Sequence, residues 1–247
     1  MPTIFGANTE SAAYEIANSL RFNDGDSPKL ERTVGTPTNE KIYTFSGWVK
    51  KADAGVSNYI LGTPPEGDRL SLGDNILFMT NGSADAYLQT ARKTRDVSAF
   101  YHIVIAYDTT QGTAANRIKL YLNGEQVPND IASHNSNYPA QNYDIPGLAN
   151  GQTIHVGAEV RASTHRFSGY MCEHHYIDGQ ALAPTAFGKF QEDTGIWVPI
   201  RYTGTFGNSG HRLEFKQTGT SANASGKGAD TSGNDNHFTC NGLETHN

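Results

Sequence analysis

The sequence predicts an all-β protein, an antiparallel two-sheet β-sandwich, from its length, its composition and its strand patterns. Its 247 residues are a usual length for one such domain. Hydrophobic residues make up 36% of the chain and charged residues 18%, so both classes are scarce. Helical bundles and coiled coils are rich in Ala, Glu, Lys and Leu, and this composition therefore argues against them. The chain holds 26 Gly, 12 Tyr and 11 Phe, which is typical of β proteins with many turns. That aromatic content and a net charge of only −6 exclude a disordered chain.

The expected strands are runs of alternating or β-branched residues that Gly, Pro, Asn or Asp bound on either side. They cover 19–22, 29–33, 42–51, 58–62, 69–72, 75–80, 86–90, 100–107, 117–122, 152–157, 165–177 and 211–216. Apolar residues of 42–51 fall on both parities, which predicts a central strand covered on both faces. Asn123-Gly124 directly follows 117–122 and predicts a tight hairpin turn. Residues 184–190 are expected to form a short helix or a turn.

The chain is expected to hold one sandwich domain, residues 19–217, after an N-terminal arm of residues 1–18. Residues 218–247 are rich in Gly, Ser and Asn, so they are expected to be a flexible C-terminal segment. The N-terminus lacks the basic and apolar regions of a secretory signal, which predicts synthesis in a cytosol. Cys172 and Cys240 fit no metal-binding spacing, and the sequence leaves their pairing open.

Charge and hydropathy argue against nucleic acid and against a membrane as partners. The isoelectric point is near 5.8, and the most basic stretch, 91–95, is short and is followed by Asp96. Binding to phosphates needs clustered Lys and Arg, and no such cluster is present. No apolar run approaches the roughly 18 residues that a membrane span needs.

Three stretches of the sequence resemble the laminin-G-like, concanavalin A-like jelly-roll modules. They are YTFSGWVKK at 43–51, FYHIVIAYD followed by RIKLYLNGEQV within 100–127, and IHVGAEV followed by FSGYMCEHHYIDGQAL within 154–182. At the level of pattern the resemblance covers about residues 15–215. It implies a jelly-roll sandwich whose usual task is to bind glycans.

The two ends of the sequence resemble, more narrowly, a version of this module in large structural proteins of tailed, especially marine, bacteriophages. The segments are 177–215, 229–242 and the lead 11–33, with Lys189 where that version usually has an acidic residue. The resemblance implies a non-enzymatic virion protein, in a tail fibre, another appendage or a capsid decoration, with more chain after residue 247. Expected partners are other virion proteins and a host-surface glycan. A homo-oligomer is expected, a trimer by analogy.

The sequence motifs give little support for an enzymatic function. Glucanase relatives carry their carboxylates as Glu-x-Asp-x-x-Glu on one strand, whereas Glu173, Asp178 and Glu214 are isolated here. Glu173 is therefore expected to be hydrogen-bonded within the sandwich. His174 and His175 are adjacent on a strand, so they should point to opposite faces and cannot share a metal. No catalytic residue is predicted. A carbohydrate-binding module of a bacterial surface protein and a glycoside hydrolase of the same fold remain the alternatives.

The long loop 128–151 lacks apolar periodicity and is the candidate contact surface, because long loops in compact domains are often functional. Aromatic rings and planar polar groups suit both a sugar and a subunit interface. The candidate residues are His134, Asn135, Asn137, Tyr138, Asn142 and Tyr143.

Calcium is the candidate metal, since two turns are rich in the oxygen ligands that it prefers. Hydrogen-bonded turns without a metal have the same composition. The candidate ligands are Asp24, Asp26, Asp230, Ser232, Asn234 and Asn236. No other cofactor is indicated.

Overall fold

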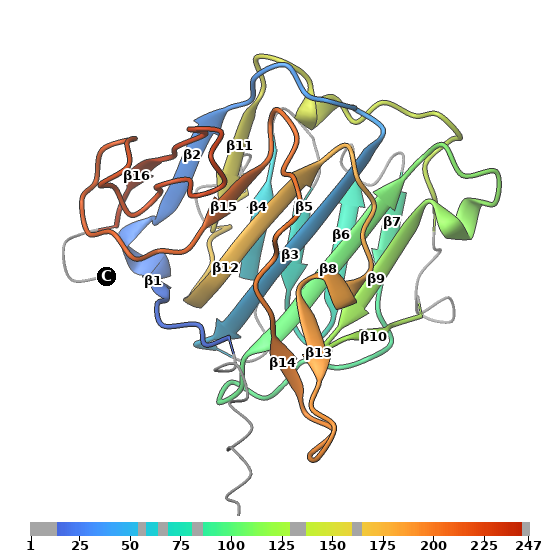
Figure 1. The fold of residues 1–247 in the computed structure, drawn as a ribbon, viewed down its shortest axis with the longest axis horizontal. Helices are drawn as coiled ribbons and strands as arrows, with labels where there is room; N and C mark the ends of the chain where they lie inside the picture. The colour runs from blue at the N-terminus through green and yellow to red at the C-terminus, as the bar shows by residue number, and fades with distance from the viewer. Residues whose placement is uncertain are drawn as a thin grey trace, which may run out of the picture.

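The computed structural model describes residues 14–53, 58–63, 69–80, 86–128, 137–159 and 165–243. They form two antiparallel sheets that pack face to face (Figure 1). The first sheet has the order β1 (Leu20–Phe22), β12 (Gly169–Asp178), β3 (Ile42–Lys51), β8 (Tyr101–Asp108), β9 (Ile118–Leu122) and β10 (Glu125–Gln126), with β15 (His211–Leu213) also paired to β12. The second has the order β16 (Thr239–Asn241), β2 (Lys29–Thr33), β11 (Thr153–Val156), β4 (Asn58–Gly62), β5 (Arg69–Leu72), β6 (Ile76–Thr80) and β7 (Ala86–Gln89). The predicted all-β sandwich is confirmed.

The main core lies between the two sheets and follows the alternation of the strands. In β9, Ile118, Leu120 and Leu122 are buried while the two residues between them are half-buried. This is the pattern of a strand with one face on the core. The turn after β9 is the expected Asn123-Gly124 hairpin, with both residues at positive φ.

A second, smaller core covers the outer face of the first sheet. Val104 and Ile177 contribute outward side chains from β8 and β12, and Phe187 and Tyr202 pack onto them from the segment that follows β12. This cover explains why β3 is buried on both faces, as its sequence predicts. Unlike the main core, it is closed on its outer side by residues outside the two large sheets.

The segment that covers the outer face starts after Asp178, the last residue of β12. Its end, at Ser209, returns to the Asp178 side chain. The buried carboxylate of Asp178 accepts hydrogen bonds from the backbone N–H groups of Thr38 (2.6 Å), Asn39 (3.2 Å) and Ser209 (3.0 Å). One side chain therefore ties the loop before β3 to the end of the cover. The carboxylate also provides a hydrogen-bond acceptor for the buried N–H group of Ser209.

Within the cover, a hairpin of β13 (Gly188–Phe190) and β14 (Trp197–Pro199) projects from the lower edge in Figure 1. The sequence predicts a short helix or turn over 184–190. The structure has both a 3-10 turn, Pro184–Ala186, and the first strand of this hairpin. Two strands of three residues each are too short for a recognisable alternation.

The C-terminal segment differs from the flexible tail that its composition suggests. β16 pairs with β2 and forms the edge of the second sheet. Phe238 is fully buried in the main core, and Asp230 is buried beside β15. The described residues after 217 are therefore part of the sandwich.

The described helical segments are 3-10 turns of three residues. Within the described part of the chain, no helix has the length and hydropathy to cross a bilayer. Cys172 and Cys240 are both free thiols.

A tryptophan-lined groove as the candidate binding site

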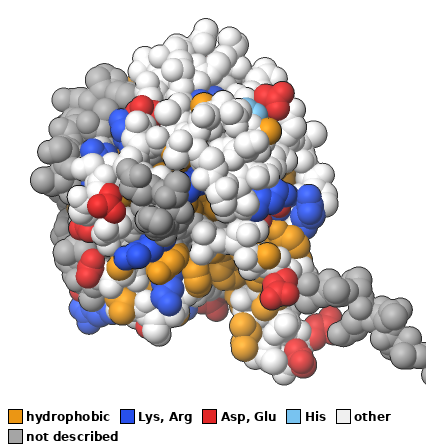
Figure 2. Space-filling model, turned by 90° about the vertical axis from the view of Figure 1, so that its left-hand side faces the viewer, with side chains coloured by type: hydrophobic (Ala, Val, Ile, Leu, Met, Phe, Trp, Pro, Cys, Tyr) orange, Lys and Arg blue, Asp and Glu red, His pale blue; other side chains and the backbone are white. Residues whose placement is uncertain are grey.

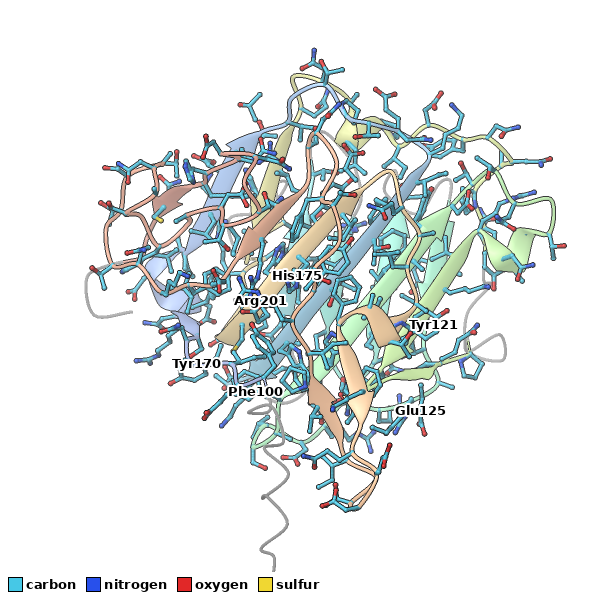
Figure 3. All side chains as sticks on the ribbon, in the orientation of Figure 1. Phe100, Tyr121, Glu125, Tyr170, His175 and Arg201 are labelled. Carbon is cyan, nitrogen blue, oxygen red and sulfur yellow. The ribbon has the colours of Figure 1, made fainter. Side chains whose placement is uncertain are left out.

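A groove of about 310 Å³ lies where the β13–β14 hairpin meets the outer face of the first sheet. Figure 3 shows two residues of its rim, Phe100 and Glu125, on either side of this hairpin. The lining residues are Trp48, Arg92, Phe100, Asn123, Glu125, Phe190, Gly195, Ile196 and Trp197. Both tryptophans of the chain are among them.

Below the groove, the ring of His102 lies between the two tryptophans. Its centroid is 4.7 Å from that of Trp48, on which it stacks, and 5.9 Å from that of Trp197, whose plane is tilted by 24° from its own. The Trp197 indole N–H donates to His102 Nδ1 (3.0 Å), and Ser46 Oγ lies 2.9 Å from Nε2. Burial lowers the pKa of His102 to about 3. The imidazole is therefore neutral, accepts at Nδ1 and carries its proton on Nε2, from which it donates to Ser46.

Trp197 is fixed on two sides by glycine. A Cβ at Gly124, which has φ +84°, or at Gly188 would overlap the indole ring. Only a residue without a side chain lets the hairpin backbones approach the ring this closely. The indole is thus held before any ligand arrives.

Three apolar side chains form the exposed walls of the groove. Phe100 is 38% exposed, Phe190 47% and Ile196 59%. Phe190 contacts Trp197 edge to face, with ring centroids 4.9 Å apart. In the view of Figure 2, hydrophobic side chains gather over the lower part of the molecule. Grouped exposure of large apolar residues marks an interaction site more often than scattered exposure does.

One end of the groove is polar. Arg92 and Glu125 form an ion pair there (Nη1 to Oε2, 2.7 Å). The side-chain oxygen of Asn123 accepts the backbone N–H of His102 (2.8 Å). Among the lining residues Glu125 is the only acid, whereas glycoside hydrolysis uses two carboxylates. The groove can stack on a ring and hydrogen-bond its hydroxyl groups, but it does not provide a hydrolytic pair.

Glu173 is held in an ion-pair network, as expected for a carboxylate within the sandwich. Both of its oxygens accept hydrogen bonds from Arg212 (3.0 Å each), and Tyr14 donates to Oε1 (2.7 Å). Glu173 lies at φ +46° in a bulge of β12. Burial, and then its hydrogen bond to Glu173, raises the pKa of Tyr14 to about 12. The carboxylate oxygens of Glu173 are therefore used in hydrogen bonds within this network.

The two adjacent histidines point to opposite faces, which confirms that prediction. His174 packs against Phe45 and His211 in the main core. His175 packs against Phe187 and Phe206 under the cover. Burial lowers the pKa of His174 to about 3 and that of His175 well below 6.5.

The described residues of the candidate contact loop are not among those that line the groove. His134 and Asn135 fall outside the described residues. Asn137 exchanges backbone hydrogen bonds with Tyr87 of β7, and Tyr138 packs against the main core. The remaining two candidates lie near the end of β8. They are Asn142, whose N–H donates to the carbonyl of Thr109, and Tyr143, whose carbonyl accepts the Thr109 hydroxyl. A shared ligand for these residues stays a prediction.

The candidate calcium ligands lie in two separate turns. Asp230 accepts backbone N–H bonds from Arg212, Ser232 and Asn236, and also the Ser232 hydroxyl. Asn234 donates its amide to the carbonyl groups of residues 207 and 210.

The other turn is the 3-10 turn Asp24–Asp26, where Asp26 accepts the side-chain amide of Asn23. Among the described residues, no group of three or more His, Cys, Asp or Glu side chains is placed to hold a metal. Asp230 and Asp26 accept hydrogen bonds from protein groups in and beside these turns, and calcium stays a prediction.

Sequence analysis missed the groove because its residues come from four distant segments. They are Trp48, residues 92–100, residues 123–125 and residues 190–197. One signal was available: the chain has only two tryptophans, and both line the groove. Periodicity alone does not reveal that the hairpin folds back over the sheet.

Comparison with known families agrees with this geometry. Residues 24–185, about two thirds of the chain, match the Concanavalin A-like lectin/glucanases superfamily. The chain belongs to this superfamily. The match ends before the β13–β14 hairpin, so four of the residues that line the groove lie outside it. A search of curated proteins finds no match.

Solved structures show the same lectin-like fold. A putative carbohydrate binding protein from Bacteroides ovatus aligns with a TM-score of 0.58 and 14% identity, over 88% of this chain and 59% of that one. A heptameric SAP-like pentraxin from Limulus polyphemus aligns with a TM-score of 0.51 and 16% identity, over 69% of this chain and 80% of that one. At such identities the likeness establishes the fold of this superfamily member and nothing narrower.

Proposed function

We propose that this protein is a non-enzymatic virion structural protein that binds a glycan on the host surface. The observation that carries the binding role is the groove, whose aromatic walls and polar end are the groups that hold sugars. Membership of a lectin superfamily supports it, as does the fold shared with a structure described as a putative carbohydrate binding protein.

The non-enzymatic part of the proposal rests on the carboxylates. Glu125 is the single acid of the groove, and both oxygens of Glu173 are occupied by Arg212 and Tyr14. A general acid must be free to give its proton to the leaving group. Glu173 does not line the groove, and Glu125 has no second carboxylate among the lining residues.

The virion part rests on the resemblance of segments 11–33, 177–215 and 229–242 to phage structural proteins. In this proposal the domain belongs to a tail fibre, another appendage or a capsid decoration, and contacts other virion proteins as a homo-oligomer, a trimer by analogy. Antibody labelling of purified particles tests the location. Sixty copies or multiples indicate a capsid, three or six a tail, and none the alternative, a module of a bacterial surface protein.

A glycan array with the full chain tests the binding role, and a reducing-end assay on every bound saccharide tests for cleavage. We expect binding without turnover. Turnover that disappears in Glu173→Gln would establish a hydrolase instead. An array without any bound glycan would refute the recognition role.

A further inference from the structure

We propose that the groove selects a neutral saccharide of one or two rings, stacked on its aromatic walls and oriented by the Arg92–Glu125 ion pair. This inference rests on the proposed function and names the ligand class of that site. Size, charge and rigidity of the groove each support it.

The volume limits the ligand. About 310 Å³ is at the small end of ligand sites, which span roughly 300–1,000 Å³. Such a groove accommodates the end of a glycan rather than a long stretch of it. Phe100 and Phe190 expose ring surface on its walls. A sugar ring can place its C–H face on such a surface, while its hydroxyl groups turn to the polar end.

The polar end has no net charge to offer. Arg92 is the only cation that lines the groove, and its guanidinium is paired with Glu125 at 2.7 Å. A carboxylate on the ligand would have to compete with Glu125 for Arg92 and would meet a like charge. Hydroxyl groups avoid this conflict, because they donate to a Glu oxygen and accept from the N–H groups of Arg. The pair therefore favours neutral sugars over sialic or uronic acids.

The aromatic wall is rigid, which reduces the entropy lost on binding. The Phe190 ring contacts the Trp197 ring edge to face. Trp197 is in turn fixed by its hydrogen bond to His102 and by the close approach of the backbone at Gly124 and Gly188. Phe190 follows residue 185, outside the family match. The aromatic stacking surface would thus come from this chain's own hairpin, whereas the Arg92–Glu125 pair lies within the region of the family match.

Intrinsic fluorescence is the readout, because both tryptophans of the chain line the groove. The full chain is titrated with lactose, maltose and cellobiose, and in parallel with sialyllactose and a glucuronic acid disaccharide. We expect at least one neutral sugar to bind more tightly than both acidic sugars. Phe190→Ala should lower the affinity for that sugar about tenfold. Tyr170→Ala is the matched control, an aromatic of 36% exposure outside the groove (Figure 3), and should bind like the unchanged chain.

Charge variants test the role of the ion pair. Glu125→Gln frees Arg92 and should improve binding of the acidic sugars about tenfold, and adding Arg92→Gln should remove that gain. Both residues are largely exposed, so neither change should unfold the protein, which thermal unfolding by circular dichroism checks.

Three results would overturn the proposal. Tightest binding of an acidic sugar by the unchanged chain would refute the ligand class. Glycan binding that survives the double variant Phe190→Ala with Ile196→Ala would place the site elsewhere and leave the proposed function intact. Failure to bind any saccharide, together with cross-linking of two copies through the groove, would refute both and make the groove an interface.

Discussion

At the scale of single residues, the candidate site depends on two glycines that no apolar pattern would single out. Asn123-Gly124 is recognisable as a turn, because both residues adopt positive φ. What the sequence does not reveal is that the turn must also leave room for an indole from β14, more than seventy positions later. The sequence therefore predicts the positive φ of the turn, but it does not predict the need for space beside the Trp197 indole.

Gly124→Ala should destabilise the protein by about 2 kcal/mol, because the new Cβ overlaps the Trp197 ring and the backbone keeps positive φ. Urea unfolding followed by fluorescence measures this. Gly151→Ala also has positive φ, at +85°, but its Cβ meets nothing within 4 Å. It should therefore cost less than Gly124→Ala. Equal losses would mean that the indole is not held by the glycine.

At the scale of elements, the sequence predicted most strands, including short ones such as 58–62 and 69–72, and missed the hairpin that covers the first sheet. The segments 42–51 and 100–107 match β3 and β8 closely, because a run of apolar and β-branched residues buried on both faces has few alternatives. The hairpin of β13 and β14 was missed, since its position depends on what it packs against. The groove depends on the same long-range packing, so the sequence did not reveal it.

The bulge in β12 is the second element whose role needed the structure. It turns Glu173 out of the strand register and onto Arg212, which β15 supplies, and Tyr14 joins from the N-terminal arm. Sequence reasoning correctly expects a hydrogen-bonded carboxylate here. Its partners are 39 and 159 positions away, so spacing cannot identify them.

Glu173→Gln should cost about 3 kcal/mol, because it leaves the buried charge of Arg212 without its bidentate partner. Tyr14→Phe should cost only about 1 kcal/mol, since it removes one hydrogen bond. Denaturant unfolding of both single variants and the double variant gives their coupling. Glu125→Gln, in an exposed pair, is the control and should change stability by less than about 0.5 kcal/mol. A Glu173→Gln effect as small as this control would contradict the network.

At the scale of the whole molecule, composition indicates a sandwich but misjudges where it ends. Residues 218–236 are low in complexity, which is typical of a linker. They are fixed instead by side chains such as Asp230 and by the burial of Phe238. A few anchoring contacts outweigh the composition of the segment.

A chain that stops at residue 217 should therefore be strongly destabilised. It loses β16 at the edge of the second sheet and the buried Phe238 ring, which packs on His211 and under Arg32. The Phe238 side chain alone contributes about 2 kcal/mol. Thermal unfolding of the two chain lengths compares them, with Phe238→Ala in the full chain as an intermediate case. An unchanged transition would show that the sandwich is complete at residue 217.

The stability of the whole molecule should depend on acid, because several histidines are buried in neutral form. Burial lowers the pKa of His102 and His174 to about 3 and that of His155 to about 4, and it lowers the pKa of His175 and His211 well below 6.5. The unfolded chain binds protons at these residues below pH 6.5, whereas in the folded chain His155 binds one only near pH 4, and His102 and His174 only near pH 3. Stability must therefore fall as the pH drops through this window.

Urea unfolding at pH 7, 6, 5 and 4 measures that loss, which should grow by about 1.4 kcal/mol per pH unit for each such histidine below pH 6. His102→Gln is the informative variant. Its amide can still accept from Trp197 and donate to Ser46, but it does not titrate. The acid slope should decrease by one histidine's share while the fold persists. A stability that is level from pH 7 to 4 would mean that these imidazoles are protonated in the folded state, and the stack of Trp48, His102 and Trp197 would then need another account.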